Sequence, residues 1–394
     1  MEKNAQELYN ERVARLKTTI NLEEPDRVPV YFPCETWLAS YGGYTVQEMV
    51  YDYGKLLAAC EKTIQEFQWD CVWTPLGVWP APIFDAVGQS QYEVAGEHLE
   101  TGSSFQWPDV SPMAPEEYPE FIANPYTFII EKLMPRRAKE LAKPWPRNAI
   151  ALAKAALAFG QYLNIMGAGF QRWAEVYGMP LLLAGLTQAP MDIIEDQYRG
   201  FRGIVMDIKR RPDDVIAACE ALLPYMIEWG DRGYLGPPGV DFPLIFIPIH
   251  IPTFLRPADF EKFYWPTFRA LLEALAERGR CSLVFFEGDW EPYLEYLTQL
   301  PKGKVVGLFE QKVELIKKAL EKNMCVAGGI PDSLLGYGTE EECVAHAKKV
   351  IDACAPGGGF IFSSDKALLS PNDAKPENLA AVTKFIKEYG VYKK

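Results

Sequence analysis

The chain has 394 residues, 48% of them hydrophobic and 13% aromatic, which is enough apolar material for a large buried core. Its formal net charge of −13 argues against nucleic acid or an anionic membrane as a partner, because neither attracts a polyanion. Residues 1–18 lack the apolar core of a signal peptide, and we expect a cytoplasmic protein without membrane spans. The eight cysteines form no CxxC pair, which favours reduced, buried thiols.

The N-terminal part is expected to alternate between helix and strand. Residues 2–20 carry apolar side chains at helical spacing among charges, which predicts an exposed amphipathic helix. Residues 27–33 are predicted to form a strand that ends just before Glu35. A capping box opens a helix over residues 45–67, and residues 70–75 form the next strand.

The middle of the chain is less regular. Residues 84–107 alternate weakly between apolar and polar, which suits a hairpin. The segment from about residue 109 to 160 is polar and contains several prolines, which predicts a helical insertion packed outside the main fold. A short strand is expected at residues 163–166, stopped by the Gly-Ala-Gly of residues 167–169, and helices are expected over residues 171–230.

Beyond residue 240 strands and helices alternate regularly. The strands are predicted at residues 242–249, 282–286, 304–309, 324–327 and 360–362, and the helices at residues 257–278, 290–300, 313–322, 340–355 and 376–389. Such alternation predicts a parallel sheet, and about eight strands favour an α/β fold of the (β/α)8 TIM barrel type. No GxGxxG or GxxxxGK follows the first strand, as an open nucleotide-binding sheet would usually require. We expect one domain over residues 1–394, led by an N-terminal helix within residues 1–25.

Polar residues follow most of the predicted strands. In chain order they are Glu35, residues 73–79, His250, Glu287 with Asp289, Glu310 with Gln311, and Asp365 with Lys366. In a barrel these positions meet at one mouth. So many carboxylates would repel one another unless a proton, a cation or a metal neutralises them.

Two arrangements of these residues are open. If His250 and the carboxylates converge, they supply the nitrogen and oxygen ligands that a divalent ion such as zinc accepts. If they are spread out, a protonated carboxyl and a carboxylate can act as general acid and base. Structural alternatives are open as well: His250 as a buried hydrogen-bonded imidazole, Glu310 paired with Lys366 or with a helix start, and Glu287 or Asp289 capping the next helix, although we favour a site role for these last two.

Other side chains admit two interpretations as well. Trp37, Trp73, Trp79 and Phe170 either line a wide apolar mouth for a flat ligand or simply pack in the core. Arg136-Arg137 either forms an anion site or, as we favour, a solvated helix end.

Several segments together resemble the uroporphyrinogen decarboxylase superfamily, whose members are (β/α)8 barrels. They are Arg-Val-Pro-Val at residues 27–30, Gly-Ala-Gly-Phe at 167–170, Leu-Arg-Pro-Ala-Asp-Phe-Glu-Lys-Phe-Tyr-Trp-Pro at 255–266, Gly-Gly-Gly-Phe-Ile-Phe at 357–362 and Pro-Glu-Asn-Leu at 376–379. The resemblance spans almost the whole chain. The motifs are fairly specific together and weak singly.

The chain departs from the decarboxylases of that superfamily. These carry an Arg-Gln-Ala-Gly-Arg segment after the first strand and a catalytic Asp after the second. Here residues 33–38 read Pro-Cys-Glu-Thr-Trp-Leu, and residues 78–80 read Val-Trp-Pro. Glu35 would repel the octa-anionic porphyrinogen, so the resemblance does not extend to that substrate.

The chain also departs from the methylcobamide-dependent methyltransferases of the superfamily. Their zinc-binding His-x-Cys reads Phe285-Phe-Glu287 here, and their later Cys falls near Asp365-Lys366. The chain is similar to members that demethylate methoxylated compounds with glutamate and histidine ligands. That resemblance implies a zinc site drawn from four residues, His250, Glu287, Glu310 and Asp365.

The resemblance therefore implies a corrinoid-linked methyltransferase that acts on a small aromatic or ether methyl donor. No Asp-x-His-x-x-Gly occurs, so the corrinoid would sit on a separate protein. The expected catalytic residues are Glu287, Asp289, His250 and Glu310; Trp37, Trp73, Trp79 and Phe170 would bind the cofactor, and Glu35, Gln311 and Lys366 the substrate. A homodimer is also implied.

Two alternatives stay open beside this reading. One is a carboxy-lyase that uses Asp289 or Glu287 as proton carrier. The other is a non-catalytic corrinoid- or tetrapyrrole-binding protein, which should bind its ligand unchanged when Glu287 is replaced by Gln.

Overall fold

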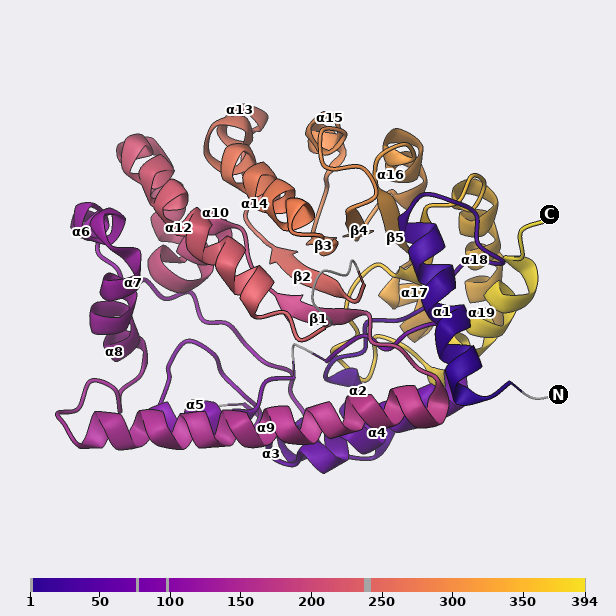
Figure 1. Ribbon diagram of the computed structural model, residues 1–394, viewed down its shortest axis with the longest axis horizontal. Coiled ribbons are helices and arrows are strands. Elements are labelled where there is room, and N and C mark those ends of the chain that lie inside the picture. Colours follow the sequence, from indigo (N-terminus) through magenta and orange to yellow (C-terminus); the bar gives the residue numbers. More distant parts are fainter. Residues whose placement is uncertain (1–2, 76–77, 97–98, 237–241, 394) are drawn as a thin grey trace.

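Six parallel strands form the centre of the molecule. The structure is a computed structural model that describes residues 3–75, 78–96, 99–236 and 242–393. The strands are β1 (Leu183–Leu186), β2 (Leu244–Ile249), β3 (Ser282–Phe286), β4 (Val305–Phe309), β5 (Cys325–Ile330) and β6 (Phe360–Ser364). They are neighbours in chain order, each parallel to the next, with helices arranged outside them (Figure 1).

Two short N-terminal segments close this sheet into a barrel. Val30 bridges Phe362 of β6 in parallel, and Val72 bridges Leu181 just before β1. Between the two segments, the backbone N–H of Asp70 donates to the carbonyl of Val30 at 2.9 Å. With these two positions the fold is the predicted (β/α)8 TIM barrel.

The helices surround the barrel or extend from it. The longer ones are α1 (Ala5–Ile20), α4 (Tyr53–Phe67), α9 (Arg147–Tyr177), α11 (Gly200–Arg210), α12 (Pro212–Arg232), α14 (Trp265–Glu277), α16 (Val313–Leu320), α18 (Glu340–Cys354) and α19 (Pro376–Tyr389). The shorter ones are α2 (Trp37–Gly42), α3 (Val46–Tyr51), α5 (Ala81–Val87), α6 (Tyr118–Ala123), α7 (Pro125–Phe128), α8 (Met134–Arg137), α10 (Pro190–Ile193), α13 (Pro257–Asp259), α15 (Leu294–Leu297) and α17 (Asp332–Tyr337).

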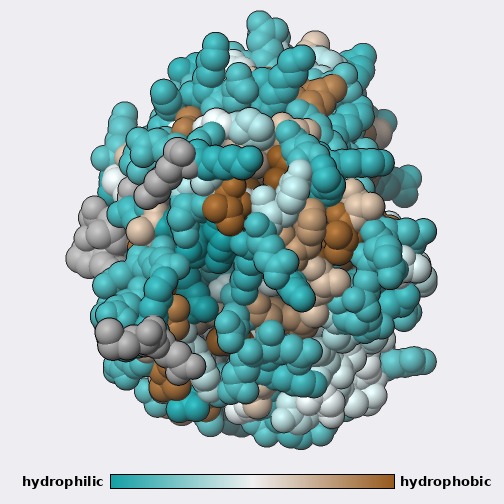
Figure 2. Space-filling view, turned by 90° about the vertical axis from the view of Figure 1, so that its right-hand side faces the viewer, coloured by the Kyte–Doolittle hydropathy of each residue, from teal (hydrophilic) through white to brown (hydrophobic). Residues whose placement is uncertain are grey.

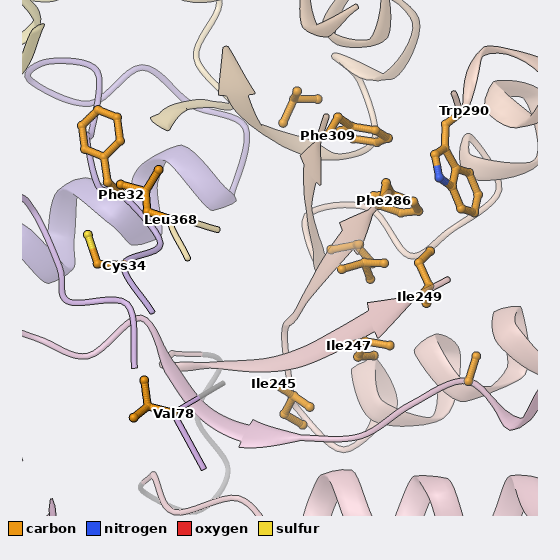
Figure 3. Packing of buried hydrophobic residues seen from close by; sticks show 14 of the residues in the cluster. Phe32, Cys34, Val78, Ile245, Ile247, Ile249, Phe286, Trp290, Phe309 and Leu368 are labelled. Carbon is orange, nitrogen blue, oxygen red and sulfur yellow. The ribbon is translucent and has the colours of Figure 1, made fainter. Parts of the chain in front are cut away.

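Alternate side chains of each strand enter two different cores. In β2, Ile245, Ile247 and Ile249 belong to the core between strands and helices (Figure 3). Phe246 instead packs against the cluster that fills the barrel, which includes residues of all six strands. Because side chains alternate along a strand, every second residue faces the inside of the barrel. The residue that continues this inner face beyond the strand lies at the carboxyl end of the barrel.

Helix α1 closes the amino end of the barrel, which corrects the expectation of an exposed leading helix. Leu16 and Ile20 join the inner core, and the guanidinium groups of Arg12 and Arg15 are buried as well. Of the charged residues that suggested exposure, Arg12 and Arg15 find partners inside the fold, while Lys3 and Glu7 are exposed. Arg12, for example, donates to the carbonyls of Tyr177 and Gly178 at 2.8 Å.

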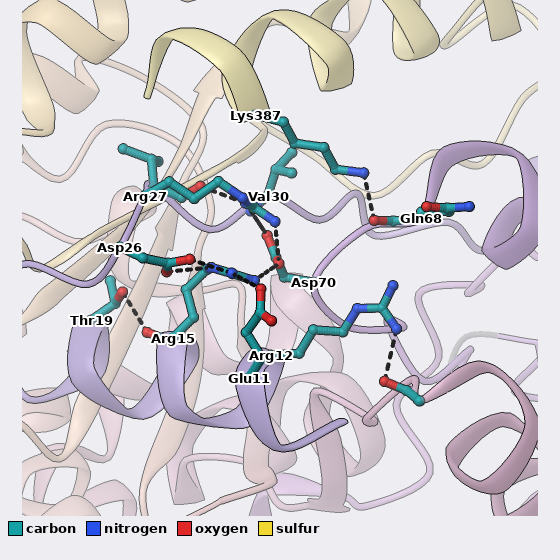
Figure 4. A network of polar contacts seen from close by, with 12 residues as sticks. Glu11, Arg12, Arg15, Thr19, Asp26, Arg27, Val30, Gln68, Asp70 and Lys387 are labelled. Carbon is teal, nitrogen blue, oxygen red and sulfur yellow. Dashed lines mark hydrogen bonds and ion pairs between the residues drawn. The ribbon is translucent and has the colours of Figure 1, made fainter. Parts of the chain in front are cut away.

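A buried carboxylate, Asp70, joins α1 to the first two barrel segments (Figure 4). It accepts hydrogen bonds from Arg15 at 2.6 Å, from Arg27 at 2.8 Å and from the backbone N–H of Val30 at 2.8 Å. Burial alone would raise the pKa of Asp70, but Arg27 and Arg15 hold it below its usual value. Asp70 thus stays ionised in the folded protein.

Two predicted elements in the middle of the chain are wrong. The strand expected at residues 163–166 lies inside α9, and the barrel strand is instead β1, in a region expected to be helical. Of the two glycines that suggested a strand end, Gly169 serves helix packing, because a side chain there would meet Leu57 of α4 at 2.4 Å, whereas a side chain at Gly167 would meet nothing within 4 Å. Because β1 has only four residues, its sequence pattern cannot be recognised as a strand next to the long apolar helix α9.

The hairpin expected over residues 84–107 is only partly present. Its start is the end of helix α5, because residues 81–87 form helical turns. Glu93 and Gln106 do pair in antiparallel fashion, with hydrogen bonds of 2.9 and 3.0 Å. Residues 97–98 of the expected hairpin lie outside the described residues.

Helix α9 is long and apolar enough to cross a membrane by length and composition, which the sequence analysis did not expect. A single such helix is weak evidence for a span, and α9 packs against α1, α4 and α5 along one edge of the barrel (Figure 1). The side of the molecule that carries α1 and both chain ends is mostly hydrophilic (Figure 2).

We predict that Asp70→Asn lowers the free energy of unfolding by about 3–5 kcal/mol, because two arginines lose their buried counter-charge. Asp26→Asn is the matched control: its side chain is 55% exposed, and we expect a loss of about 1 kcal/mol or less. Chemical denaturation measures both, and an Asp70→Asn protein as stable as wild type at pH 7 would contradict the assigned role.

Wild type and Asp70→Asn should also differ in how their free energy of unfolding depends on pH. The folded-state pKa of Asp70 is lowered, so its contribution is present above the unfolded value of about 3.9 and is lost as the pH falls below it. Wild-type stability should therefore fall more steeply in acid than that of Asp70→Asn.

Candidate active site

A cavity of about 1050 Å³ opens at the carboxyl end of the barrel. Its walls carry many aromatic side chains: Trp73, Trp79, Phe84, Tyr92, Phe105, Trp107, Tyr198, Phe201, Trp229, Phe246 and Phe285. These side chains come from barrel strands, from α5, from the segment after it, from the residues just before α11, and from α11 and α12. A cavity of this size and lining suits a small, flat, largely apolar ligand.

The polar groups of the cavity gather around His250. Its Nδ1 lies 3.0 Å from both carboxylate oxygens of Asp196, and its Nε2 lies 3.6 Å from Oε1 of Glu287. Asp196 also accepts a hydrogen bond from Gln188 at 2.7 Å. Glu195 lines the cavity beside them. The imidazole is thus held between two carboxylates from different strand ends.

The inner face of β2 delivers His250, and a buried carboxylate fixes it there. Phe246, Pro248 and His250 follow the period of two and all line the cavity. Asp192 accepts from the backbone N–H groups of His250 at 2.7 Å and Ile251 at 3.1 Å, and from the hydroxyl of Tyr264 at 2.6 Å. Burial raises the pKa of Asp192 to about 6.

Glu195 and Asp196 lie on a short π-helix, Ile194–Arg199, that continues α10. Such wide turns often occur at functional sites. The sequence analysis missed both residues because it missed β1, whose carboxyl end leads to them. The available signal was the cluster of acids that follows Gln188-Ala-Pro, at Asp192, Glu195 and Asp196.

Charge is crowded at this corner of the cavity. Burial would lower the pKa of His250, but Asp196 and Glu287 raise it to about 10. Burial and then the nearby Glu310 raise the pKa of Glu287 to about 7, against the opposing pull of His250. Burial and its hydrogen bond with Asp196 raise the pKa of Glu195 to about 9. The corner therefore favours a bound cation or retained protons.

The structure places several of the sequence-predicted residues in the cavity wall. Glu35 accepts a hydrogen bond from the indole N–H of Trp73 at 2.5 Å, and both line the cavity. Trp79 lies in the wall as well, against Phe84 and Tyr92. These residues emerge from the first two barrel segments, as the strand-end argument predicted.

Other predicted residues near the strand ends lie outside the wall. Glu310 accepts from the N–H of Gly288 at 2.7 Å, and Asp365 from that of Asp332 at 2.9 Å. Asp289 is exposed and pairs with Lys312 at 3.0 Å. Gln311 and Lys366 are exposed too.

Two predicted aromatic residues pack in the core. The indole of Trp37 is buried, stacks on Tyr41 and donates to the carbonyl of Ala374 at 2.9 Å. Phe170 lies on α9 and packs against Trp173, with ring centroids 5.4 Å apart. Neither side chain lines the cavity among the residues that the structure describes.

The structure brings together a set of possible metal ligands that differs from the expected set. Among the described residues, Glu195, Asp196 and His250 form the group whose ligand atoms all lie within 4.8 Å of one another. Glu287 faces the other imidazole nitrogen. Of the four residues expected to bind zinc, only His250 belongs to this group. Glu310 and Asp365 instead cap neighbouring backbone.

Comparisons with known proteins agree with the fold. Among solved structures, a methyltransferase from Methanosarcina mazei has a TM-score of 0.65 to this chain, over 98% of this chain and 99% of that one, with 13% sequence identity. At that identity the likeness shows the fold alone. No curated protein matches.

The model of the uroporphyrinogen decarboxylase (URO-D) family matches residues 162–389. The match takes in β1 to β6 and the whole of α19, together with His250 and Glu287. Since it covers more than half of the chain, the protein belongs to the uroporphyrinogen decarboxylase family.

Proposed function

We propose that this protein transfers a methyl group from a small aromatic methyl ether to a corrinoid carried by a separate protein. Family membership and the methyltransferase-like fold support a methyltransferase or decarboxylase function in broad terms. The observation that carries the finer proposal is the position of His250, between Asp196 and Glu287, at the polar corner of an aromatic cavity.

The donor atoms at this corner suit a divalent cation. One imidazole nitrogen and carboxylate oxygens form a donor set that zinc accepts. Burial, and after it the neighbouring carboxyl groups, raise the pKa values of Glu195 and Glu287, and a bound cation would favour their ionised forms. Glu195, Asp196 and His250 would hold the ion. When bound, it would act as a Lewis acid toward the ether oxygen of the donor.

The chain's own residues orient the methyl donor and supply the proton that the leaving oxygen needs. The aromatic wall binds the ring and excludes water. The bond between the methyl carbon and the ether oxygen breaks with both electrons on the oxygen, and the methyl group passes to the reduced cobalt of the partner protein. The phenolate oxygen takes up one proton, and Glu287, with a pKa of about 7, is suited to donate it.

A decarboxylase is the second candidate, because a protonated Glu287 or Glu195 can also protonate a carbanion. The negative charge of the cavity argues against a decarboxylase whose substrate is a polyanion. Five carboxyl groups line the cavity, from Glu35, Asp109, Glu195, Asp196 and Glu287, against the cationic Arg137 and His250 among the described lining residues. An octa-anionic porphyrinogen would be repelled from such walls.

We predict that Glu287→Gln lowers the rate of methyl transfer at least ~100-fold, because the amide cannot donate the proton. The assay follows loss of cob(I)alamin absorbance with 4-methoxybenzoate as donor. Asp289→Asn is the matched control, since Asp289 is exposed and paired with Lys312, and its rate should equal that of wild type. A Glu287→Gln enzyme within about threefold of wild type would exclude this role.

The metal assignment predicts about one zinc per chain after zinc loading and gel filtration. Asp196→Asn and His250→Ala should lose most of that zinc, whereas Glu310→Gln and Asp365→Asn should keep it. Inductively coupled plasma mass spectrometry gives the stoichiometry. Wild-type protein without stoichiometric metal would remove the Lewis acid and leave proton transfer by Glu287 as the means of activation.

Asp192 is expected to act as a positioning residue for His250. Asp192→Ala should lower kcat about 10- to 100-fold with little change in KM, because the end of β2 loses its anchor while the aromatic wall stays intact. Asp192→Asn keeps an oxygen acceptor and should restore most of kcat. Equal loss of kcat in both variants would count against a positioning role.

A further inference from the structure

Arg137 is a cation in the cavity wall without an acidic partner. It ends helix α8 and lines the cavity near the aromatic residues that follow α5. Its Nη2 donates to Oε1 of Gln197. Its Nε is shielded from solvent and has no hydrogen-bond partner, and no carboxylate pairs with the guanidinium in the part of the chain that the structure describes.

Among the described residues, three buried arginines, Arg15, Arg199 and Arg280, have the acidic partners that the half-buried Arg137 lacks, whereas the buried Arg12 donates to two backbone carbonyls instead. Arg15 pairs with Asp26 and Asp70, and Arg199 pairs with Asp207 at 2.6 Å. A shielded guanidinium without a counter-charge is costly, and burial lowers the pKa of Arg137 to about 10. The side chain remains charged at neutral pH. An anion that enters the cavity would supply the missing charge.

The backbone fixes Arg137 between the aromatic wall and the polar corner. The N–H of Ser90 donates to the carbonyl of Arg137 at 2.8 Å, which places the end of α8 next to Tyr92 and its aromatic neighbours. On the other side, Gln197 follows Asp196 directly in the chain, and Asp196 pairs with His250. A ring in the aromatic wall can thus present one substituent to Arg137 and another to His250.

We infer that Arg137 binds a carboxylate of the methyl donor, so that the donor is a methoxylated aromatic acid. This inference rests on the proposed function for the identity of the reacting group. The planar Nη–H donors of the cavity-lining guanidinium match the geometry of a carboxylate. The acidic groups of the cavity then act on the opposite end of the donor. A single carboxylate is accepted, whereas a polyanion is repelled.

Arg137 lies outside residues 162–389, which the family model matches. The helices around α8 therefore add a charge to the cavity from a part of the chain that the match does not cover. This placement makes Arg137 a specificity-determining residue of this chain, distinct from the barrel residues that hold His250 and Glu287.

The test is binding of 4-methoxybenzoate and of its neutral analogue 4-methoxybenzamide to the full chain, by titration calorimetry. Wild type should bind the acid at least ~10-fold more tightly than the amide. Arg137→Met should lose that preference to within about twofold, and Arg137→Lys should keep part of it, since the charge remains but the planar fork is lost. Thermal unfolding of each variant checks that it is folded.

Arg136→Met is the matched control, because Arg136 is the exposed neighbour on the same helix and pairs with Glu117 at 2.7 Å. It should retain the wild-type preference. Equal affinity of wild type for acid and amide, a preference that survives in Arg137→Met, or binding of neither ligand would each overturn the inference. Because the two ligands can be compared on wild type alone, this part of the test does not depend on whether a variant folds.

The two proposals fail in different ways. If the acid is preferred through Arg137 but no methyl group reaches cob(I)alamin, the carboxylate assignment stands and the methyltransferase proposal falls. If methyl transfer proceeds equally well from 4-methoxybenzamide and 4-methoxybenzoate, the methyltransferase proposal stands and the carboxylate assignment falls.

Discussion

Backbone pairing of two short N-terminal segments with both edges of the six-stranded sheet is the constraint on which the rest of the structure depends. Val30 pairs with β6 and Val72 pairs with the start of β1, and Asp70 joins the two segments to α1. Only a closed barrel makes the carboxyl ends of all strands face one space. Glu35 and Trp73 therefore share a cavity with His250 and Glu287 although they lie more than 170 residues apart in the chain.

Charge crowding in that shared space gives the site its chemistry. Asp196 and Glu287 hold His250 as a cation, while burial and mutual repulsion keep Glu287 and Glu195 close to protonation. A cation and a proton are two ways of satisfying the same excess of negative charge. In the proposed methyl transfer from an ether, either a cation or a proton at this corner would stabilise the charge on the leaving oxygen.

Much of the barrel could be predicted from the sequence because its later strands are long apolar runs between polar turns. The segment around β2 is such a run, and its inner face leads to His250 by simple alternation. Glu287, Glu35 and Trp73 were predicted from their positions at or just after the ends of predicted strands. These placements depend only on the period of two and on strand ends, which a single sequence displays well.

What the sequence did not reveal depends on contacts between distant segments. β1 has four residues, and without it the acids Glu195 and Asp196 could not be assigned to a strand end. Asp289 looked equivalent to Glu287, but the turn at Gly288 sends it outward to Lys312. Arg137 was interpreted as a solvated helix end, because nothing local shows that α8 ends against the cavity.

The central claim is that Glu195, Asp196 and His250 form a metal centre at the mouth of the barrel. The most direct measurement is an anomalous difference map from crystals soaked in zinc chloride, with data collected on both sides of the zinc absorption edge. The account predicts one strong peak at bonding distance from His250 and from an oxygen of Asp196 or Glu195. Peaks confined to surface carboxylates, with none at His250, would contradict it.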